Sequence, residues 1–370
     1  MKTKKILLWG ASPELPKNED FKTSFARSGE NFGNTLIGNG VVSVLKNCEY
    51  IYRHELKTPE EANERCDHIV IPAANFLWKG FDFGFMSDFI EATTLPVTII
   101  GLGAQTSDRS QVATIHPNTL RLMKILSERS PALGVRGFYT AEVLAAHGIL
   151  NLEVLGCPSL YSNLQPPKQI IPIAIEGFKN LAVNFSRRVA PHSFMPLRLQ
   201  EIENKLLEIA IRLRMPFIAQ DEIEELEISD NCITQDSIST VSKYFSQIDS
   251  DEVIGYFSSS TRYFCTFSDW SKFILTRSGT IGSRLHGNII SLINGKPGLV
   301  IAHDSRTLEL CALTGMPYIN IREDGVGSLS EEGLIDRITN TKYDIFCKNM
   351  QNLFIKYKHF LEKSDLPNYL

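Results

Sequence analysis

Three features are missing from this chain of 370 residues, and each absence argues against a class of protein. The seven cysteines are scattered without a C-x-x-C motif or metal-ligand spacing, so neither a zinc module nor a disulfide framework is indicated. No apolar run approaches the roughly 20 residues that cross a bilayer. The formal net charge is −4, which argues against a nucleic-acid binder because such proteins carry a basic surplus.

The remaining composition is that of an ordinary soluble globular protein. Hydrophobic residues make up 43% of the chain, and the mean hydropathy is −0.08. A single hydrophobic core rarely serves 370 residues, so we expect two domains. Scattered cysteines fit a reducing compartment, and the apolar run near the N-terminus is too short for a signal peptide. We therefore expect a cytoplasmic protein, with at most peripheral contact at the inner face of the membrane.

Helices and strands alternate along most of the sequence, which predicts parallel sheets. The pattern is clearest between Trp270 and Pro317, where two helices, 286–293 and 307–313, each follow a short apolar run. Gly295 and Pro297 stop the first of these helices. The other predicted strands share a short apolar character and cover residues 5–9, 68–73, 97–101, 132–135, 152–155, 181–185, 217–219 and 253–256.

The polar, proline-rich segment Gln165–Lys168 is the best candidate for a linker. It predicts an N-terminal domain over residues 1–165 and a C-terminal domain over 166–340. The amphipathic tail, 341–370, is expected to form a helix that packs back on the first domain. Two Rossmann-like βα domains that face a central cleft resemble the glycosyltransferase-B arrangement, and this is the predicted fold.

Two polar clusters follow predicted strands, at 283–288 and 303–306. In open α/β sheets, ligands bind at the carboxyl ends of the strands, so Arg284, His286 and Arg306 should converge on one pocket. Arg306 lies in the first turn of a helix, where a cation is disfavoured by roughly 0.3–1 kcal/mol unless an anion is bound. The cluster therefore predicts a site for phosphate or carboxylate. The alternative is that Arg284 pairs with a structural carboxylate and His286 caps a helix.

Two other segments are informative through their residue types alone. Gly101 to Gln105 follows a buried strand but lacks the third glycine and the later acidic residue of a dinucleotide fingerprint, which excludes NAD binding. We interpret it as a glycine-lined floor for substrate. The stretch from Asp221 to Asp230 is interpreted as an acidic face of no evident chemistry.

The segment SRLHGNIISLINGKP, followed by IAHDSR, resembles the C-terminal signature of the polysaccharide pyruvyltransferase family. In that family an Arg-x-His at a strand end and a basic residue twenty positions further on hold phosphoenolpyruvate. Arg284, Leu285 and His286 match the first element, and Arg306 matches the second. An N-terminal V-R-x-x-x-(S/T)-x-x-x-L pattern is similar to GVRGFYTAEVL, which supplies Arg136.

This chain departs from the family at two positions. The family usually reads N-x-G-D where this sequence has Asn31 to Asn34, so Asn34 replaces the acid and hydrogen bonding to a sugar is the role that remains. A simple helix N-cap is the alternative for this position. The family also has Asp-Pro where this chain has Cys157-Pro158, and we interpret Cys157 as a small buried residue.

The resemblance implies transfer of pyruvate from phosphoenolpyruvate to two hydroxyls of a sugar in a polysaccharide precursor, with a lipid-linked glycan among the implied acceptors. Arg136, Arg284 and Arg306 would grip the phosphate and carboxylate, and His286 would act as general acid. Asn31, Asn34 and Gln105 are the predicted acceptor-binding residues. The scheme requires no metal and no cofactor beyond phosphoenolpyruvate as the donor substrate.

Two other functions remain open at this stage. A nucleotide-sugar-dependent glycosyltransferase could use the same fold, and its retaining members commonly carry paired glutamates in the C-terminal domain. The sequence after Pro297 offers only Glu309 in that region. A non-catalytic glycan-binding relative is the third class, and the intact set of Arg284, His286 and Arg306 argues against it.

Overall fold

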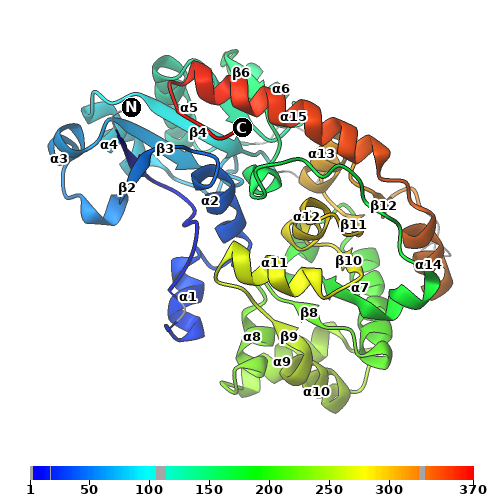
Figure 1. The fold of residues 1–370 in the computed structure, drawn as a ribbon. Helices are drawn as coiled ribbons and strands as arrows, with labels where there is room; N and C mark the ends of the chain where they lie inside the picture. The colour runs from blue at the N-terminus through cyan, green and yellow to red at the C-terminus, as the bar shows by residue number, and fades with distance from the viewer. Residues whose placement is uncertain (1–2, 17, 106–113, 325–329) are drawn as a thin grey trace.

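Two six-stranded parallel sheets, each flanked by helices, form the computed structural model of the chain (Figure 1). It describes residues 3–16, 18–105, 114–324 and 330–370. The first sheet has the order β2-β1-β3-β4-β5-β6 and the second β12-β11-β10-β7-β8-β9, with every recorded pairing parallel. These are the two Rossmann-like halves of the predicted glycosyltransferase-B-like fold, which is confirmed.

Strands and helices alternate along most of the first half. They are β1 (Lys4–Leu8), α1 (Phe21–Arg27), α2 (Asn34–Val42), β2 (Cys48–Tyr52), α3 (Pro59–Arg65), β3 (His68–Pro72), α4 (Gly84–Ala92), β4 (Val97–Leu102), α5 (Pro117–Arg129), β5 (Leu133–Val135), α6 (Phe138–Ala145), β6 (Leu152–Val154) and the 3₁₀ turn η2 (Pro158–Tyr161). Every residue of β3 and β4 is buried. Continuous apolar runs of this kind are typical of parallel strands covered on both faces.

The second half repeats the alternation with longer helical insertions. Its elements are β7 (Leu181–Asn184), the 3₁₀ turn η4 (Arg187–His192), α7 (Pro196–Leu213), β8 (Phe217–Ile218), α8 (Ile223–Ser229), α9 (Gln235–Tyr244), α10 (Ser250–Ser260), β9 (Thr261–Arg262), α11 (Phe267–Leu275), β10 (Gly279–Gly282), α12 (Leu285–Ile293), β11 (Gly298–Ala302), α13 (Ser305–Thr314), β12 (Tyr318–Asn320) and α14 (Glu331–Asn340). As predicted, a helix follows each of the strands β10 and β11. Asp304 caps α13 by accepting a 2.7 Å bond from the amide of Thr307.

The strand predicted over residues 253–256 is wrong, because these residues lie inside helix α10. Asp249 caps this helix and accepts hydrogen bonds from the amides of Asp251 and Glu252. Val253 and Phe257, one helical turn apart, are both fully buried. The apolar spacing is therefore helical, and a short apolar run cannot distinguish the two structures without its cap.

Helix α15 (Asp344–Lys363) runs from the second half across the first, and both chain termini lie at the first half (Figure 1). Its Tyr357 and Phe354 rings lie 4.3 and 4.9 Å from the ring of Tyr161 in η2. Phe360 packs closely on β5, since a methyl group on Gly134 would lie 3.2 Å from its ring. One hydrophobic cluster contains residues of α15 and of both sheets. The domain limits at residues 165 and 340 stay predictions.

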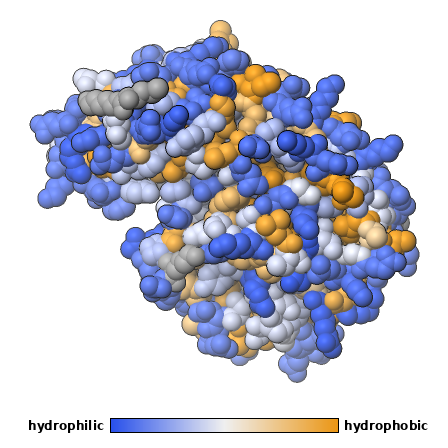
Figure 2. Space-filling model, viewed as in Figure 1, coloured by the Kyte–Doolittle hydropathy of each residue, from blue (hydrophilic) through white to orange (hydrophobic). Residues whose placement is uncertain are grey.

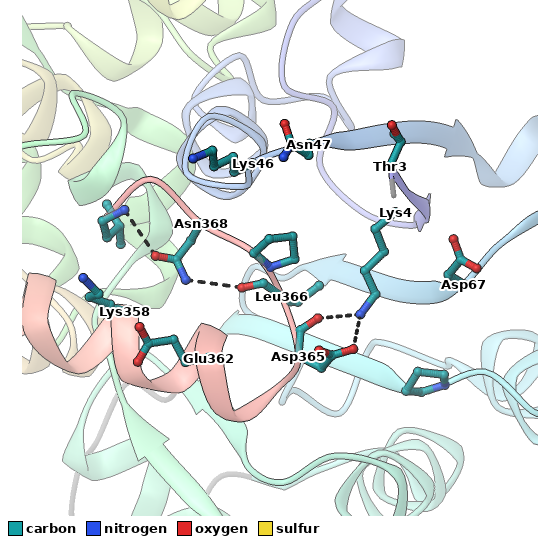
Figure 3. Close-up of a pocket in the computed structure, with 13 residues that line it drawn as sticks. Thr3, Lys4, Lys46, Asn47, Asp67, Lys358, Glu362, Asp365, Leu366 and Asn368 are labelled. Atoms are coloured by element: carbon teal, nitrogen blue, oxygen red, sulfur yellow. Dashed lines mark hydrogen bonds and ion pairs between the residues drawn. The ribbon is translucent and has the colours of Figure 1, made fainter. Parts of the chain in front are cut away.

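The residues after α15 are tied to the start of the first sheet (Figure 3). The ammonium of Lys4 lies 2.7 Å from the carboxylate of Asp365. The amide of Tyr369 donates to the carbonyl of Val44, and Lys46 donates its amide to Pro367. These contacts fix the direction in which α15 crosses the sheet.

On the face shown in Figure 2, hydrophobic residues form small separate patches among hydrophilic ones. Within the described part of the chain, no helix combines the length and the apolar character needed to cross a membrane.

The position of α15 makes a prediction about stability. Replacing the buried Phe360 by alanine leaves a cavity beside β5, and we expect a loss of about 3–5 kcal/mol in the free energy of unfolding. Ile355→Ala, on the exposed face of the same helix, should change it by no more than about 0.5 kcal/mol. Urea denaturation of both variants measures the difference. Equal stability of the two variants would show that α15 contributes little to the core.

Candidate functional site

A cavity of about 610 Å³ lies between the two halves, at the carboxyl ends of their strands. Gln105 and Arg136 reach it from the ends of β4 and β5, and Arg306 from the start of α13 after β11. The eight residues that the sequence analysis selected all line it: Asn31, Asn34, Gln105, Arg136, Arg284, Leu285, His286 and Arg306. The structure thus brings the predicted residues together, while their individual roles stay predictions.

Arg284 is buried and paired with acids that follow β8. Its Nη1 atom lies 2.9 Å from the carboxylate of Asp221, and its Nε atom lies 3.6 Å from Glu222. Burial alone would lower the pKa of Arg284, but the two carboxylates outweigh it and the net shift is upward. Burial and the charge of Asp221 together raise the pKa of Glu222 well above its usual value. Arg284 therefore has a carboxylate partner, as the alternative interpretation predicted.

The interpretation of residues 221–230 as an acidic face is wrong for the acids that turn inward, because Asp221 and Glu222 pair with Arg284 and the buried Glu225 pairs with Arg187. Asp221 and Glu222 turn into the site because β8 ends at Ile218 and the chain bends toward Arg284 before α8 begins. Glu222 is fully buried and accepts hydrogen bonds from the amides of Gln220 and Asp221. The sequence does not show that this bend lies beside the end of β10, because that depends on how the strands pack.

Arg306 and Arg136 are held in different ways. Arg306 lies 3.2 Å from Asp304, the residue that caps α13. Burial lowers the pKa of Arg306, and the positive charges of Arg284 and Arg136 add to that shift. Arg136 donates from Nε to the carbonyl of Gly101 at 2.8 Å and from Nη1 to Asn75 at 3.0 Å. These acceptors are neutral, so they position the guanidinium of Arg136 without cancelling its charge.

His286 lies in the first turn of α12, where Arg284 at the N-cap provides no side-chain acceptor for the first amides of the helix. Its Nε2 atom is 3.6 Å from the sulfur of Cys157, which is buried as predicted. A methyl group on Gly33 would lie 2.5 Å from its Nδ1 atom. Burial lowers the pKa of His286 well below its usual value, with further lowering by the arginines at 136, 284 and 306. The imidazole is therefore neutral at neutral pH.

The side chains of the predicted acceptor residues hold the first half of the cavity in shape. Asn31 accepts a hydrogen bond from the amide of Gly33 at 2.8 Å. Asn34 is the first residue of α2, and its side chain donates to the carbonyl of Ser28 at 3.0 Å. The N-cap alternative for Asn34 is therefore wrong. Gln105 accepts from Asn75 at 3.3 Å.

Two glycines beside the site are small because of their close neighbours. A methyl group on Gly287, next to His286, would lie 2.5 Å from the side chain of Asn184. Its small size serves the packing of α12 on β7. A methyl group on Gly103 would lie 3.1 Å from the Cδ atom of Arg136, but Gly103 is not among the described residues that line the cavity, so the glycine-lined floor stays a prediction.

The profile of the polysaccharide pyruvyl transferase family matches residues 31–305 of the chain. The chain belongs to this family. It is therefore a transferase, and its family points to polysaccharide pyruvylation. The matched region contains Arg136, Arg284 and His286 and ends one residue before Arg306.

No curated protein matches the chain in sequence. Similar solved structures include a UDP-GlcNAc 2-epimerase of Methanocaldococcus jannaschii in complex with UDP-GlcNAc and UDP (11% identity, 96% of this chain and 99% of that one, TM-score 0.43). S. aureus MnaA, solved with UDP, has 11% identity, 97% coverage of both chains and a TM-score of 0.45. An α,α-trehalose-phosphate synthase (UDP-forming) of Burkholderia vietnamiensis has 8% identity, 98% and 96% coverage, and a TM-score of 0.39. Similarity at this level leaves the substrate to be argued from the residues of this chain.

Several lining residues were not selected from the sequence. They are Gly29, Glu30, Ile37, Ala74, Asn75, Phe76, Phe81, Phe83, Arg188, Val189, His192, Gln220 and Asp221. Asn75 and Asp221 follow strands β3 and β8, so strict use of the strand-end rule would have found them. The aromatic residues lie in the loop between β3 and α4, where only the frequency of aromatics was a signal.

Glu309 is not placed in the cavity, where a glycosyltransferase would need its glutamate. It is buried, it is not among the lining residues, and its carboxylate accepts from the amide of Thr140 at 2.7 Å and from its hydroxyl at 3.1 Å. This contact joins α13 of the second half to α6 of the first. The one glutamate available for the alternative function is thus engaged in joining the halves.

Four arginines but only two acids, Glu30 and Asp221, occur among the described residues that line the cavity, in a protein whose net charge is −4. The described residues contain no group of three or more His, Cys, Asp or Glu side chains placed to hold a metal ion. The concentrated positive charge and the first turns of α12 and α13 suit an anionic ligand.

We expect Arg306→Ala to weaken the binding of inorganic phosphate by about tenfold or more, because a hydrogen bond to a charged partner contributes about 1.5–3 kcal/mol. Titration calorimetry measures the affinity. Arg212→Ala, which removes an arginine paired with Glu331 outside the cavity, is the matched control. Unchanged affinity in both Arg306→Ala and Arg136→Ala would contradict the assignment of an anion site.

Proposed function

We propose that the chain transfers pyruvate from phosphoenolpyruvate to two hydroxyl groups of a sugar in a polysaccharide precursor and forms a cyclic ketal. Family membership supports the reaction class. The observation that carries the donor assignment is the convergence of Arg136, Arg284 and Arg306 around His286 in one cavity. Phosphoenolpyruvate carries a phosphate and a carboxylate on adjacent groups, which matches several guanidiniums at one point.

The ion pair of Arg284 is compatible with this role. A guanidinium has five N–H donors, and Asp221 and Glu222 contact it through Nη1 and Nε. The acids hold the side chain in place, while other donors remain for an incoming anion. Arg306 and the uncapped first amides of α12 add further donors on the same side.

The chemistry requires one proton for the donor. Protonation of the enol methylene makes C2 of phosphoenolpyruvate an oxocarbenium-like electrophile, and the first sugar hydroxyl adds to it and loses its proton. The second hydroxyl then attacks C2, the bond between C2 and the phosphate oxygen breaks, and the proton of this hydroxyl leaves with inorganic phosphate. The products are the ketal and phosphate, so atoms and charge balance without an oxidant or a reductant.

His286 is the proposed general acid. Its neutral state in the free protein follows from burial and from the three arginine charges. Phosphoenolpyruvate brings negative charge to the same arginines, so binding raises the pKa of His286 toward the range in which it is protonated. The proton is thus available chiefly when the donor is bound.

The acceptor is proposed to be a glycan, carried by a lipid in the form that the family resemblance implies. Asn31, Asn34 and Gln105 lie in the first half, whereas Arg284 and Arg306 belong to the second. The scheme needs neither a metal nor a further cofactor. Because phosphoenolpyruvate is a cytoplasmic metabolite, we place the reaction in the cytoplasm, with at most peripheral contact at the inner face of the membrane.

We expect His286→Asn to reduce kcat by about 10²–10⁴-fold while phosphoenolpyruvate affinity is largely kept, because asparagine can donate a hydrogen bond but cannot deliver a proton. Phosphate release in the presence of donor and acceptor measures turnover. The exposed His359→Asn on α15 is the control.

The pH profile of the wild-type enzyme checks the same assignment. A general acid is active while protonated, so kcat should fall as pH rises through the pKa of His286 in the donor complex. That limb should lie at higher pH than the corresponding limb of kcat/KM, since the free-enzyme pKa is lowered. Near-normal turnover of His286→Asn with an unchanged profile would show that another group supplies the proton.

A further inference from the structure

A cluster of aromatic rings forms one wall of the cavity. Its rings come from the loop between β3 and α4: Phe76, Trp78, Phe81 and Phe83. The centroids of Phe76 and Phe83 are 4.5 Å apart, and those of Trp78 and Phe81 are 5.7 Å apart. Phe76, Phe81 and Phe83 line the cavity directly.

Two of these rings are exposed although they are large and apolar. Phe81 is 44% exposed and Trp78 is 36% exposed, whereas Trp9 and Trp270 are only 8% and 1% exposed. Exposed aromatic side chains gathered at the edge of a polar cavity are typical of a ligand-binding surface.

The loop that carries the rings is held by hydrogen bonds at several points. Thr119 donates its hydroxyl to the carbonyl of Phe81. Asp82 accepts from the amide of Gly84 at 2.8 Å and from Asn118 at 2.9 Å. Leu77 donates its amide to the carbonyl of Gly103. The backbone around the exposed rings is thus positioned before any ligand arrives, which lowers the entropic cost of binding.

The indole of Trp78 is fixed in its orientation as well. It folds over Gly80 so closely that a methyl group there would lie 2.0 Å from the ring. Across from it, His192 of η4 meets the indole edge-to-face at 6.3 Å. Arg188 of the same turn also lines the cavity and donates to the carbonyl of Asp221. The aromatic wall of the first half therefore faces a polar wall from the second.

We propose that Phe81 and Trp78 form a platform on which a sugar ring of the acceptor stacks, an inference that rests on the proposed function. One face of a pyranose presents C–H bonds, which pack on an aromatic face, while its hydroxyls project from the ring edge. Stacking on Phe81 leaves those hydroxyls for the amides of Asn31 and Gln105 in the same cavity. The platform selects for a pyranose with an uninterrupted C–H face.

The exposed indole provides a direct readout that does not depend on turnover. Trp78 is the most exposed of the three tryptophans, so sugar stacking should quench or blue-shift its emission in a saturable way. The probes are lactose, cellobiose and mannobiose, with UDP titrated in parallel. We expect at least one disaccharide to change the emission and Trp78→Phe to abolish the change.

Variants at Phe81 test the platform itself. Phe81→Ala should weaken disaccharide binding by about fivefold or more, in line with the loss of one stacked ring. Phe81→Leu keeps apolar volume without a ring and should be nearly as weak, whereas Phe81→Tyr should bind normally. Tyr369→Ala removes an exposed aromatic from the C-terminal tail and should change nothing. Phosphate affinity, measured in the same variants, should stay at the wild-type value and confirms that each is folded.

The possible outcomes separate the two proposals. Disaccharide binding that depends on Phe81, without any ketal formed from phosphoenolpyruvate, would overturn the pyruvyl transfer and leave the sugar platform standing. Ketal formation with an acceptor KM that is unchanged in Phe81→Ala and Phe81→Leu would overturn the platform alone. A response of Trp78 to UDP but to none of the disaccharides would also overturn it, because it assigns the rings to a nucleotide base.

Discussion

The positive charge of three arginines gathered in one cavity is the constraint on which the site depends. Arg136, Arg284 and Arg306 act together on His286 and lower its pKa, so their charges meet at one point. The fold stabilises them with Asp221, Asp304 and backbone carbonyls, each placed behind a guanidinium. Binding of an anion would offset the excess positive charge of the cavity.

The two halves of the chain must be held in a defined relation for these charges to face one another. Glu309 joins α13 to Thr140 at the start of α6, only a few residues from Arg136. The hydrophobic cluster that includes α15 extends through both sheets and holds them from the side. The cavity is therefore built between two rigid sheets rather than within a single loop, which suits the positioning of several charged groups.

The positions of the three arginines could be predicted, because residues that follow parallel strands lie at the same edge of the sheet. Residues that follow β5, β10 and β11 had to meet at the carboxyl edges of their sheets, and Arg136, Arg284 and Arg306 do. The partners of these residues could not be predicted. Asp221 reaches Arg284 through a bend after β8, and the space at Gly287 is filled by Asn184 from another strand. Both contacts depend on which strands are neighbours, which a periodic pattern does not contain.

The sequence by itself determined the alternation of strands and helices, the family, and which charged residues end the strands, because each of these depends on local order along the chain. Tertiary structure alone decided three things: the acids that balance the arginines, the contact of His286 with Cys157, and the aromatic wall around Phe81. Helix α10 also belongs to what tertiary structure decided. Its apolar run predicted a strand, and its cap and buried face become evident only in the packed protein. The physical reason is that pairing, burial and pKa depend on groups distant in sequence that folding brings within a few ångströms.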